Sequence, residues 1–291
     1  MKCFYHSADL DGHCSGAIFK HIFPECETIG INYGQDFPWD KIGDGEAVAM
    51  VDFTLQPFEQ MERLDKMCHL IWIDHHKTEI QEARNRGVNI QGIQRIGIGA
   101  CALVWEWVKG QDLVHGQMPE AIRLLAEYDV WNHSDPRTLP FQYGFRMNDD
   151  TRPDNLDLWR QFICTTPHER LVANGLIAKT VEIGNVILSY ENAQNEKFCR
   201  AYAFDTELNG NKAIACNRGF TNSKVFESVW NPDQYDLMIT FCRLKPPAHK
   251  WTVSLYSTKP EIDCGVIARK FGGGGHKGAA GFQCDQLPFN H

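Results

Sequence analysis

The sequence predicts an α/β protein with a largely parallel sheet in its first part and a smaller α/β domain at its end. Two observations support this prediction. Strand-like and helix-like segments alternate along residues 1–165, which is typical of a parallel sheet covered by helices. Three of the strand-like runs also end at an acid or a histidine. Ligands gather at the carboxyl ends of parallel strands, so we expect a functional site at this edge.

The elements of the first part follow from apolar runs and apolar spacing. Short buried strands are predicted at Lys2–Tyr5, Ala47–Val51 and Leu70–Ile73. Apolar residues at helical spacing predict helices at Gly12–Phe23, Pro57–Met67, Ala100–Val108 and Ala121–Tyr128. Each predicted strand precedes a helix, as in β-α-β units.

A long helical connector and a second domain complete the chain. The domain is predicted to contain one helix, Cys264–Lys270, and strands at Ala201–Phe204, Lys212–Cys216, Leu237–Cys242 and Trp251–Tyr256. We therefore divide the chain into a first domain (1–167), a helical connector (168–196) and a second domain (197–291). The active-site cleft is expected between the two domains.

Composition restricts the class of protein. The 291 residues are 43% hydrophobic and 23% charged, typical of a globular protein. The N-terminus does not resemble a signal peptide, and no uninterrupted apolar stretch approaches the roughly 18 residues that span a bilayer. The 11 cysteines include no Cys-x-x-Cys pair. We expect a cytoplasmic protein with reduced thiols and no membrane partner.

Charge is distributed unevenly along the chain. Residues 197–291 carry 12 Lys and Arg against 8 Asp and Glu, whereas the rest of the chain has a formal balance of −12. A net charge of −8 argues against general binding to duplex DNA, which depends on many cationic contacts to phosphate. An acidic part suits cation binding and a basic part could receive an anion. A drift of surface charge explains the imbalance equally well.

The triplet Asp74-His75-His76 is the most informative motif, because packing does not explain adjacent histidines after a buried strand. Neighbouring residues of an extended segment face opposite ways. One histidine can therefore bind a metal ion while the other faces substrate.

Other acids and a histidine occur at comparable positions. His6, Asp9, Asp11 and Gly12 follow the first strand, Asp52 follows the second, and Asp129 follows a predicted helix. Carboxylates with imidazole suit Mn²⁺ or Mg²⁺. Taken singly, these residues are also compatible with a tight turn, a helix cap and a surface acid.

A glycine-rich segment lies near the C-terminus, from Phe271 to Gly281. Its four consecutive glycines let backbone N–H groups approach an anion, with His276 and Lys277 beside them. A flexible hinge is the alternative, although a hinge does not require the histidine and the Gly-Ala-Ala-Gly-Phe sequence that follow the four glycines.

Taken together, these motifs resemble those of the DHH phosphoesterase superfamily, and the glycine-rich segment resembles the signature of its DHHA1 domain. The resemblance extends from His6 to Phe282. Relatives include RecJ-type exonucleases, nano-RNases and phosphodiesterases of cyclic or linear dinucleotides. One difference is Tyr256, where many short-RNA relatives have an arginine that clamps phosphate; Tyr256 could stack on a base or pack in the core.

The resemblance implies that residues 1–167 form a metal-binding catalytic domain and that residues 197–291 form a substrate-binding domain. It also implies a role for each motif residue. One Mn²⁺ would be held by His6, Asp9 and Asp52, and a second by Asp11, Asp52, His75 and Asp129, with Mg²⁺ as the alternative metal. His76 would lie beside the scissile phosphate, and Asp74 would orient a histidine. The substrate's terminal phosphate would be bound by Gly273, Gly274, Gly275, His276 and Lys277.

The resulting functional prediction is an Mn²⁺-dependent phosphodiesterase. It would hydrolyse short oligonucleotides or linear or cyclic dinucleotides to mononucleotides by attack of a water activated by two metal ions. Two alternatives remain: a RecJ-like single-strand exonuclease and a nucleotide-binding module without catalysis. The oligomeric state stays open.

Overall fold

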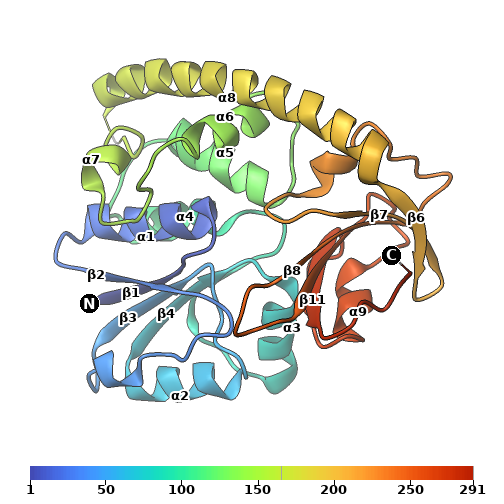
Figure 1. Cartoon of the computed structure of the whole chain (residues 1–291). Coiled ribbons are helices and arrows are strands. Elements are labelled where there is room, and N and C mark those ends of the chain that lie inside the picture. Colours follow the sequence, from blue (N-terminus) through green and yellow to red (C-terminus); the bar gives the residue numbers. More distant parts are fainter. Residues whose placement is uncertain (165, 291) are drawn as a thin grey trace. The chain divides into compact units, whose positions relative to one another are not determined.

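The structure is a computed structural model that describes residues 1–164 and 166–290 (Figure 1). The chain forms two compact units, Met1–Ile187 and Leu188–His291. One has a parallel sheet and the other a mixed sheet, and both contain helices. The prediction of an α/β fold with a parallel sheet and a second sheet is confirmed. The roles given to residues 1–167, 168–196 and 197–291 stay predictions.

The sheet of the first unit has five parallel strands in the order β2-β1-β3-β4-β5. The strands are β1 (Lys2–His6), β2 (Glu27–Ile31), β3 (Ala47–Val51), β4 (His69–Asp74) and β5 (Gln91–Gln94). The sequence predicted β1, β3 and β4. It did not predict β2 and β5, the two edge strands.

Helices cover both faces of this sheet (Figure 1). The unit contains α1 (Leu10–Ile22), η1 (Trp39–Lys41), α2 (Glu59–Met67), α3 (Lys77–Arg86), α4 (Ala100–Gly110), α5 (Glu120–Asp129), α6 (Thr138–Phe145) and α7 (Leu156–Trp159). One apolar core lies between the sheet and α1, α4 and α5, and a second lies between the sheet and α2 and α3. The continuous helix α8 (Pro167–Tyr202) begins in this unit and ends in the other.

The second unit contains a six-stranded mixed sheet in the order β10-β11-β9-β8-β7-β6. Its elements are β6 (Phe204–Leu208), β7 (Asn211–Asn217), η2 (Ser223–Phe226), β8 (Leu237–Arg243), β9 (Trp251–Tyr256), α9 (Cys264–Arg269), β10 (Gly274–Gly275) and β11 (Ala279–Cys284). Only β7 and β8 pair in parallel. Helix α9 packs its apolar side against one face of the sheet.

The predicted strand Ala201–Phe204 is wrong in most of its length. Residues 201 and 202 form the end of α8, and the strand begins only at Phe204. The N–H of Ala203 still bonds to the carbonyl of Cys199 at 3.0 Å, so helical hydrogen bonding continues to that point. A long packed helix overrides the local preference for a strand here.

The strand order places β1 and β3 side by side, although β2 separates them along the chain. The connection after β1 runs to one edge of the sheet, and later connections run toward the other. Such a reversal opens a crevice at the carboxyl ends of the two strands, where ligands bind in open α/β sheets. The predicted site residues of the first unit lie around this crevice.

Candidate metal centre

The loop after β1 holds the first residues of the centre. His6 is the last residue of β1, and Asp9 caps α1 by accepting a hydrogen bond from the N–H of Gly12 at 2.9 Å. A Cβ at position 12 would lie 2.0 Å from the carbonyl oxygen of His6, so only glycine fits. This tight turn holds the His6 Nδ1 and Asp9 Oδ2 atoms 2.9 Å apart.

Asp52, directly after β3, lies between two histidines. Its Oδ2 is 3.6 Å from Nδ1 of His6, and its Oδ1 is 3.2 Å from Nε2 of His75. The backbone of this buried residue is left-handed, with φ of 55°. Such a conformation costs on the order of 1–3 kcal/mol and often occurs at functional sites. Here it places one carboxylate between two imidazoles.

Two groups of possible metal ligands meet at this edge of the sheet. One consists of His6, Asp9 and Asp52, and the other of Asp11, His75 and Asp129. Within each group one ligand atom from every residue lies within 4.8 Å of the others. Because Asp52 also contacts His75, it links the two groups.

Asp11 lies in the first turn of α1, and its buried side chain contacts the start of α4. Its carboxylate accepts hydrogen bonds from the N–H groups of Ala100 at 2.6 Å and Cys101 at 2.8 Å. These are unpaired donors of the first helical turn, and the helix dipole favours an anion there. Asp11 thus has a structural partner as well as a place in the metal-ligand group. The sequence analysis missed these two donors; the only signal was the Gly97-x-Gly99 pattern before the apolar helix.

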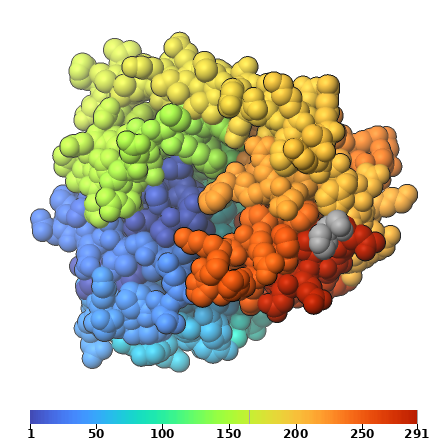
Figure 2. Space-filling view, viewed as in Figure 1, coloured from blue at the N-terminus to red at the C-terminus, as the bar shows by residue number. Residues whose placement is uncertain are grey.

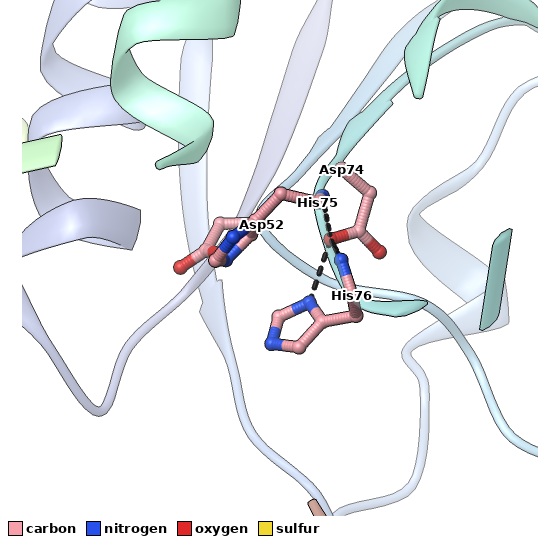
Figure 3. Close-up of side chains that lie close together, drawn as sticks. All are labelled: Asp52, Asp74, His75 and His76. Atoms are coloured by element: carbon pink, nitrogen blue, oxygen red, sulfur yellow. Dashed lines mark hydrogen bonds and ion pairs between the residues drawn. The ribbon is translucent and has the colours of Figure 1, made fainter. Parts of the chain in front are cut away.

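Asp74 is fully buried, and hydrogen bonds occupy both of its oxygens. Figure 3 shows the bonds of one oxygen with His75 and His76. Oδ1 accepts from the backbone N–H of His75 at 2.7 Å and lies 2.6 Å from Nδ1 of His76. Oδ2 accepts from the hydroxyl of Thr54 at 2.6 Å. Asp74 also belongs to a possible ligand group with Asp52 and the two histidines. Because its Oδ1 lies 2.6 Å from Nδ1 of His76, we assign Asp74 to the orientation of that ring.

Thr54 is a buried contributor that the sequence analysis missed. It lies two residues after Asp52, and its hydroxyl bonds only to the Asp74 carboxylate. Trp72 adds a weaker contact from its indole N–H at 3.3 Å. Trp72 precedes Asp74 by two residues in β4, whereas Thr54 follows the neighbouring strand β3, so no local pattern in the sequence identifies Thr54 as a partner.

Crowding of carboxylates dominates the electrostatics of the centre. Burial and the neighbouring Asp52 raise the pKa of Asp11 to about 7. Burial and Asp11 together raise the pKa of Asp129 well above its usual value. Several acids that oppose one another's ionisation form a site that a cation would stabilise.

The pKa values of the histidines are raised as well, which favours their charged form. Burial disfavours the charged form of His6, but hydrogen bonds with Asp52 and Asp9 outweigh it and raise the pKa to about 11. Burial likewise opposes protonation of His76, and Asp74 outweighs it, so the pKa of His76 rises to about 10. Without metal, imidazolium groups therefore supply the positive charge that the acids require.

The donor set fits hard divalent cations. The groups around His6 and around Asp11 each combine carboxylate oxygens with one imidazole nitrogen, and no group includes a thiolate among the described residues. Such oxygen-rich sites suit Mn²⁺ or Mg²⁺, whereas thiolate sites select softer metals. The described geometry brings together all six predicted ligands: His6, Asp9, Asp11, Asp52, His75 and Asp129. Their role as ligands stays a prediction.

Two aromatic side chains lie next to the centre and expose part of their surface. The ring of Tyr33 lies 5.7 Å from that of His6 and 4.5 Å from that of Phe53. Trp131 follows Asp129 by two residues, has a left-handed φ of 58° and is 48% exposed. Its ring contacts the ring of His133 at 4.5 Å. We call these two side chains the aromatic border: Tyr33 contacts the predicted ligand His6, and Trp131 closely follows the predicted ligand Asp129 along the chain.

The glycine-rich segment of the second unit forms a tight hairpin of β10 and β11. A Cβ at Gly273 would lie 2.1 Å from the carbonyl oxygen of Gly281, and Gly275 has a φ of 135°. The N–H groups of Gly273 and His276 bond within the unit, at 3.0 and 2.7 Å. Close backbone packing thus explains two of the glycines. Gly274, His276 and Lys277 are exposed, and their role in binding substrate stays a prediction.

Tyr256, which stands where related sequences have an arginine, lies in β9 of the same sheet. Its hydroxyl donates a long hydrogen bond, 3.4 Å, to the carbonyl of Thr221. This contact favours a packing role over base stacking.

No protein-family model matches the chain. The curated "Uncharacterized protein R106" of Acanthamoeba polyphaga mimivirus is 25% identical over 269 residues, which cover 86% of this chain and 55% of that protein. The chain thus spans about half the length of the relative that it matches.

Three solved structures are similar in the arrangement of their elements. An uncharacterized protein from Helicobacter pylori G27 covers 99% of this chain and 94% of its own (15% identity, TM-score 0.41). The pGpG-specific phosphodiesterase PggH from Vibrio cholerae covers 97% of this chain and 92% of its own (14% identity, TM-score 0.48). An exopolyphosphatase-related protein from Bacteroides fragilis covers 98% of this chain and 87% of its own (12% identity, TM-score 0.49). At these values we derive the function from the site itself.

Proposed function

We propose that this chain is a metal-dependent phosphodiesterase that hydrolyses short oligonucleotides or linear or cyclic dinucleotides to mononucleotides. The observation that carries the proposal is the position of Asp52 between two neighbouring ligand groups. Two adjacent cations suit phosphoryl chemistry in particular, because a phosphodiester anion repels nucleophiles until its charge is neutralised.

The two groups would each hold one ion, Mn²⁺ or alternatively Mg²⁺. His6, Asp9 and Asp52 would bind the first, and Asp11, Asp52, His75 and Asp129 the second. When bound, such a pair lowers the pKa of a water and neutralises phosphoryl oxygens. The contribution of this chain is to hold the carboxylates at the ends of rigid strands, where their positions are fixed before substrate arrives.

His76 is the residue that we assign to the substrate phosphate. Its Nδ1 is held by Asp74, and this pairing raises the pKa of His76 to about 10. In the metal-free protein this pairing favours the charged form of the ring. The ring can donate a hydrogen bond to a phosphoryl oxygen and can protonate the leaving oxygen. Asp74 acts through His76, so we assign it a positioning role.

The aromatic border supports a nucleotide as substrate. Tyr33 and Trp131 present ring surface next to the ligand groups. Stacking of a base on such a ring contributes about 1–3 kcal/mol and tolerates any base. We propose Trp131 as the stacking surface, because its partly exposed ring follows the ligand Asp129 so closely.

The hairpin would bind a second phosphate of the substrate. Lys277 and His276 are exposed at its turn, and they offer a cation and an imidazole to an anion. A ligand that uses two phosphate sites carries at least two phosphates separated by about a nucleoside, as a 5′-phosphorylated dinucleotide does. This part of the proposal gives the preference for short substrates.

A substrate panel tests the proposal. The protein is stripped of metal, supplied with Mn²⁺ or Mg²⁺, and incubated with 5′-phosphorylated di- to pentanucleotides, cyclic dinucleotides, a long single strand and pyrophosphate. Mononucleotide formation is measured by chromatography. We expect metal-dependent cleavage that is fastest for dinucleotides and slows as length increases.

Each alternative has its own outcome. Faster cleavage of the long strand would replace the proposal with a RecJ-like exonuclease. Metal-dependent binding of dinucleotides without turnover would indicate a nucleotide-binding module. If pyrophosphate alone is cleaved, the proposed metal centre stands and the proposed nucleotide substrate is wrong.

A further inference from the structure

Helix α8 has an apolar surface that the first unit leaves uncovered. An 18-residue window of this helix has a mean hydropathy of 1.4, and 22% of the window is buried. By length and composition alone it is the one helix in the described chain that could cross a membrane. Figure 2 shows this part of the chain, in yellow, at the surface of the molecule. A surface of this kind implies a partner.

The opposite face of α8 is fixed to α6. A Cβ at Gly184 would lie 1.7 Å from the carbonyl oxygen of Pro140, and a Cβ at Gly144 would lie 2.0 Å from that of Thr180. Backbones in such close contact hold one side of the helix firmly on the protein. Only the other side is therefore available to a partner, and a helix surrounded by lipid does not fit this packing.

A narrow seam follows the middle of the exposed face. Gly175, Lys179, Glu182 and Val186 are all exposed, and their spacing of four, three and four residues places them on one side of the helix. Val186 is 72% exposed. Apolar side chains border the seam at both ends: Val172, 53% exposed, and Tyr190, 68% exposed.

We propose that this seam pairs with the same seam of a second copy of the chain, as an antiparallel helix pair with two-fold symmetry. When one helix is reversed against its copy about a point between Lys179 and Glu182, each lysine faces a glutamate of the other copy. Gly175 then faces Val186, and Val172 lies opposite Ser189, next to Tyr190. A single surface that is complementary to itself in charge and in size is the requirement of a two-fold interface.

Two features of the seam lack an explanation within one chain. A Cβ at Gly175 would meet nothing within 4 Å, so the fold does not require this glycine, although glycine is unfavourable in a helix interior. No ion pair joins Lys179 or Glu182 to another residue in the described parts of the chain. In the pair, Val186 of the second copy fills the space at Gly175, and both charges find partners.

Charge reversal tests the pairing. Light scattering coupled to size exclusion should give the full chain a mass near twice its 33.2 kDa. Lys179→Glu and Glu182→Lys should each raise the dissociation constant by about tenfold or more, because each change turns two attractions into two repulsions. The double variant should restore the dimer. An equimolar mixture of the two single variants should form a heterodimer, since every lysine then meets a glutamate.

The controls separate a second copy from other occupants. Val266→Glu changes another exposed apolar residue and should leave the mass unchanged. A monomeric wild-type chain at up to about 100 µM, or a mixture that stays monomeric, would overturn the proposal. So would co-flotation of the wild-type chain with phosphatidylcholine and phosphatidylglycerol vesicles, which would assign the face to a membrane. None of these measurements depends on the proposed enzymatic activity.

Discussion

The sheet edge of the first unit and the hairpin of the second both attract notice in the sequence, for opposite reasons. At the sheet edge, charged side chains are buried where apolar ones would pack better: Asp11, Asp52 and Asp74. In the hairpin, side chains are absent where the backbones of β10 and β11 come together.

The two regions differ in whether packing alone explains their unusual residues. Burying a carboxylate costs several kcal/mol unless it is paired, so three buried acids at one sheet edge need a reason outside packing. A bound cation would supply that reason. Gly273 and Gly275 already have a reason within packing, because any side chain would collide with β11. The predicted binding role of the hairpin therefore rests on His276 and Lys277.

Asp52→Asn should have the largest effect of any single change. The substitution keeps the shape and removes the charge from the residue that contacts a histidine of each ligand group. We expect kcat to fall by at least about 10³-fold, because a bridging ligand serves both ions. Mn²⁺ binding measured by calorimetry should weaken in parallel.

Asp44→Asn is the matched control, because Asp44 is an exposed acid in the loop before β3. It should leave kcat and Mn²⁺ binding unchanged. Substantial Mn²⁺-dependent turnover by Asp52→Asn would show that the assigned ligand set is wrong.

Changes to the Asp74–His76 pair should have the next largest effect. His76→Ala should lower kcat by about 10²-fold or more while Mn²⁺ stoichiometry stays at two, since the ring acts on substrate. Asp74→Asn should lower kcat by about 10- to 100-fold, because it only orients His76. His69→Ala, at the exposed start of the same strand, is the control. A loss of bound Mn²⁺ in His76→Ala would make His76 a ligand.

The same pair predicts a pH dependence of the metal-free protein. The pKa of His76 is raised from 6.5 to about 10 in the fold. Its stabilising contribution is therefore complete below pH 6.5 and is lost as the pH rises toward 10. Thermal unfolding of wild type and Asp74→Asn should differ most at the low end of this range and converge at the high end. Constant separation from pH 6.5 to 10 would exclude the proposed protonation of His76.

The sequence predicted those elements that are apolar and central. Strands β3 and β4 are continuous apolar runs because helices cover both of their faces. The edge strands β2 and β5 are partly exposed and contain Gly30 and Gly92, and they carry no comparable run. Pairing with a neighbour forms them, and a pattern search along the chain does not detect pairing.

The features of the site also divide into predictable and unpredictable ones. His6, Asp52 and Asp74 were predictable because strand ends meet at one edge of a parallel sheet. The donors that hold Asp11 come from Ala100 and Cys101, 89 and 90 residues away along the chain. The left-handed backbone of Asp52 was also unpredictable, because it depends on a hydrogen bond from its N–H to the carbonyl of Ile73 in β4.

Trp131→Ala should act on substrate binding. Loss of a stacking surface should raise KM for dinucleotides by about 5- to 100-fold and leave kcat nearly unchanged. Trp131→Phe should retain most of the affinity, because it keeps an aromatic ring. If Trp131→Ala lowers thermal stability and leaves KM unchanged, the ring serves packing with His133 instead.

The hairpin should show the smallest effects, and two substitutions separate its packing from its binding. Gly273→Ala introduces a Cβ against the Gly281 carbonyl and should destabilise the protein by about 1–3 kcal/mol in urea unfolding. His276→Ala removes an exposed side chain and should leave that stability within about 0.5 kcal/mol of wild type. It should instead raise KM for 5′-phosphorylated dinucleotides several-fold, with Mn²⁺ binding unchanged, because its proposed partner is a substrate phosphate. A dinucleotide without the 5′-phosphate should not distinguish His276→Ala from wild type. Equal kcat/KM of the two proteins on the phosphorylated substrate would leave the hairpin with a structural role alone and restrict the function to the sheet edge.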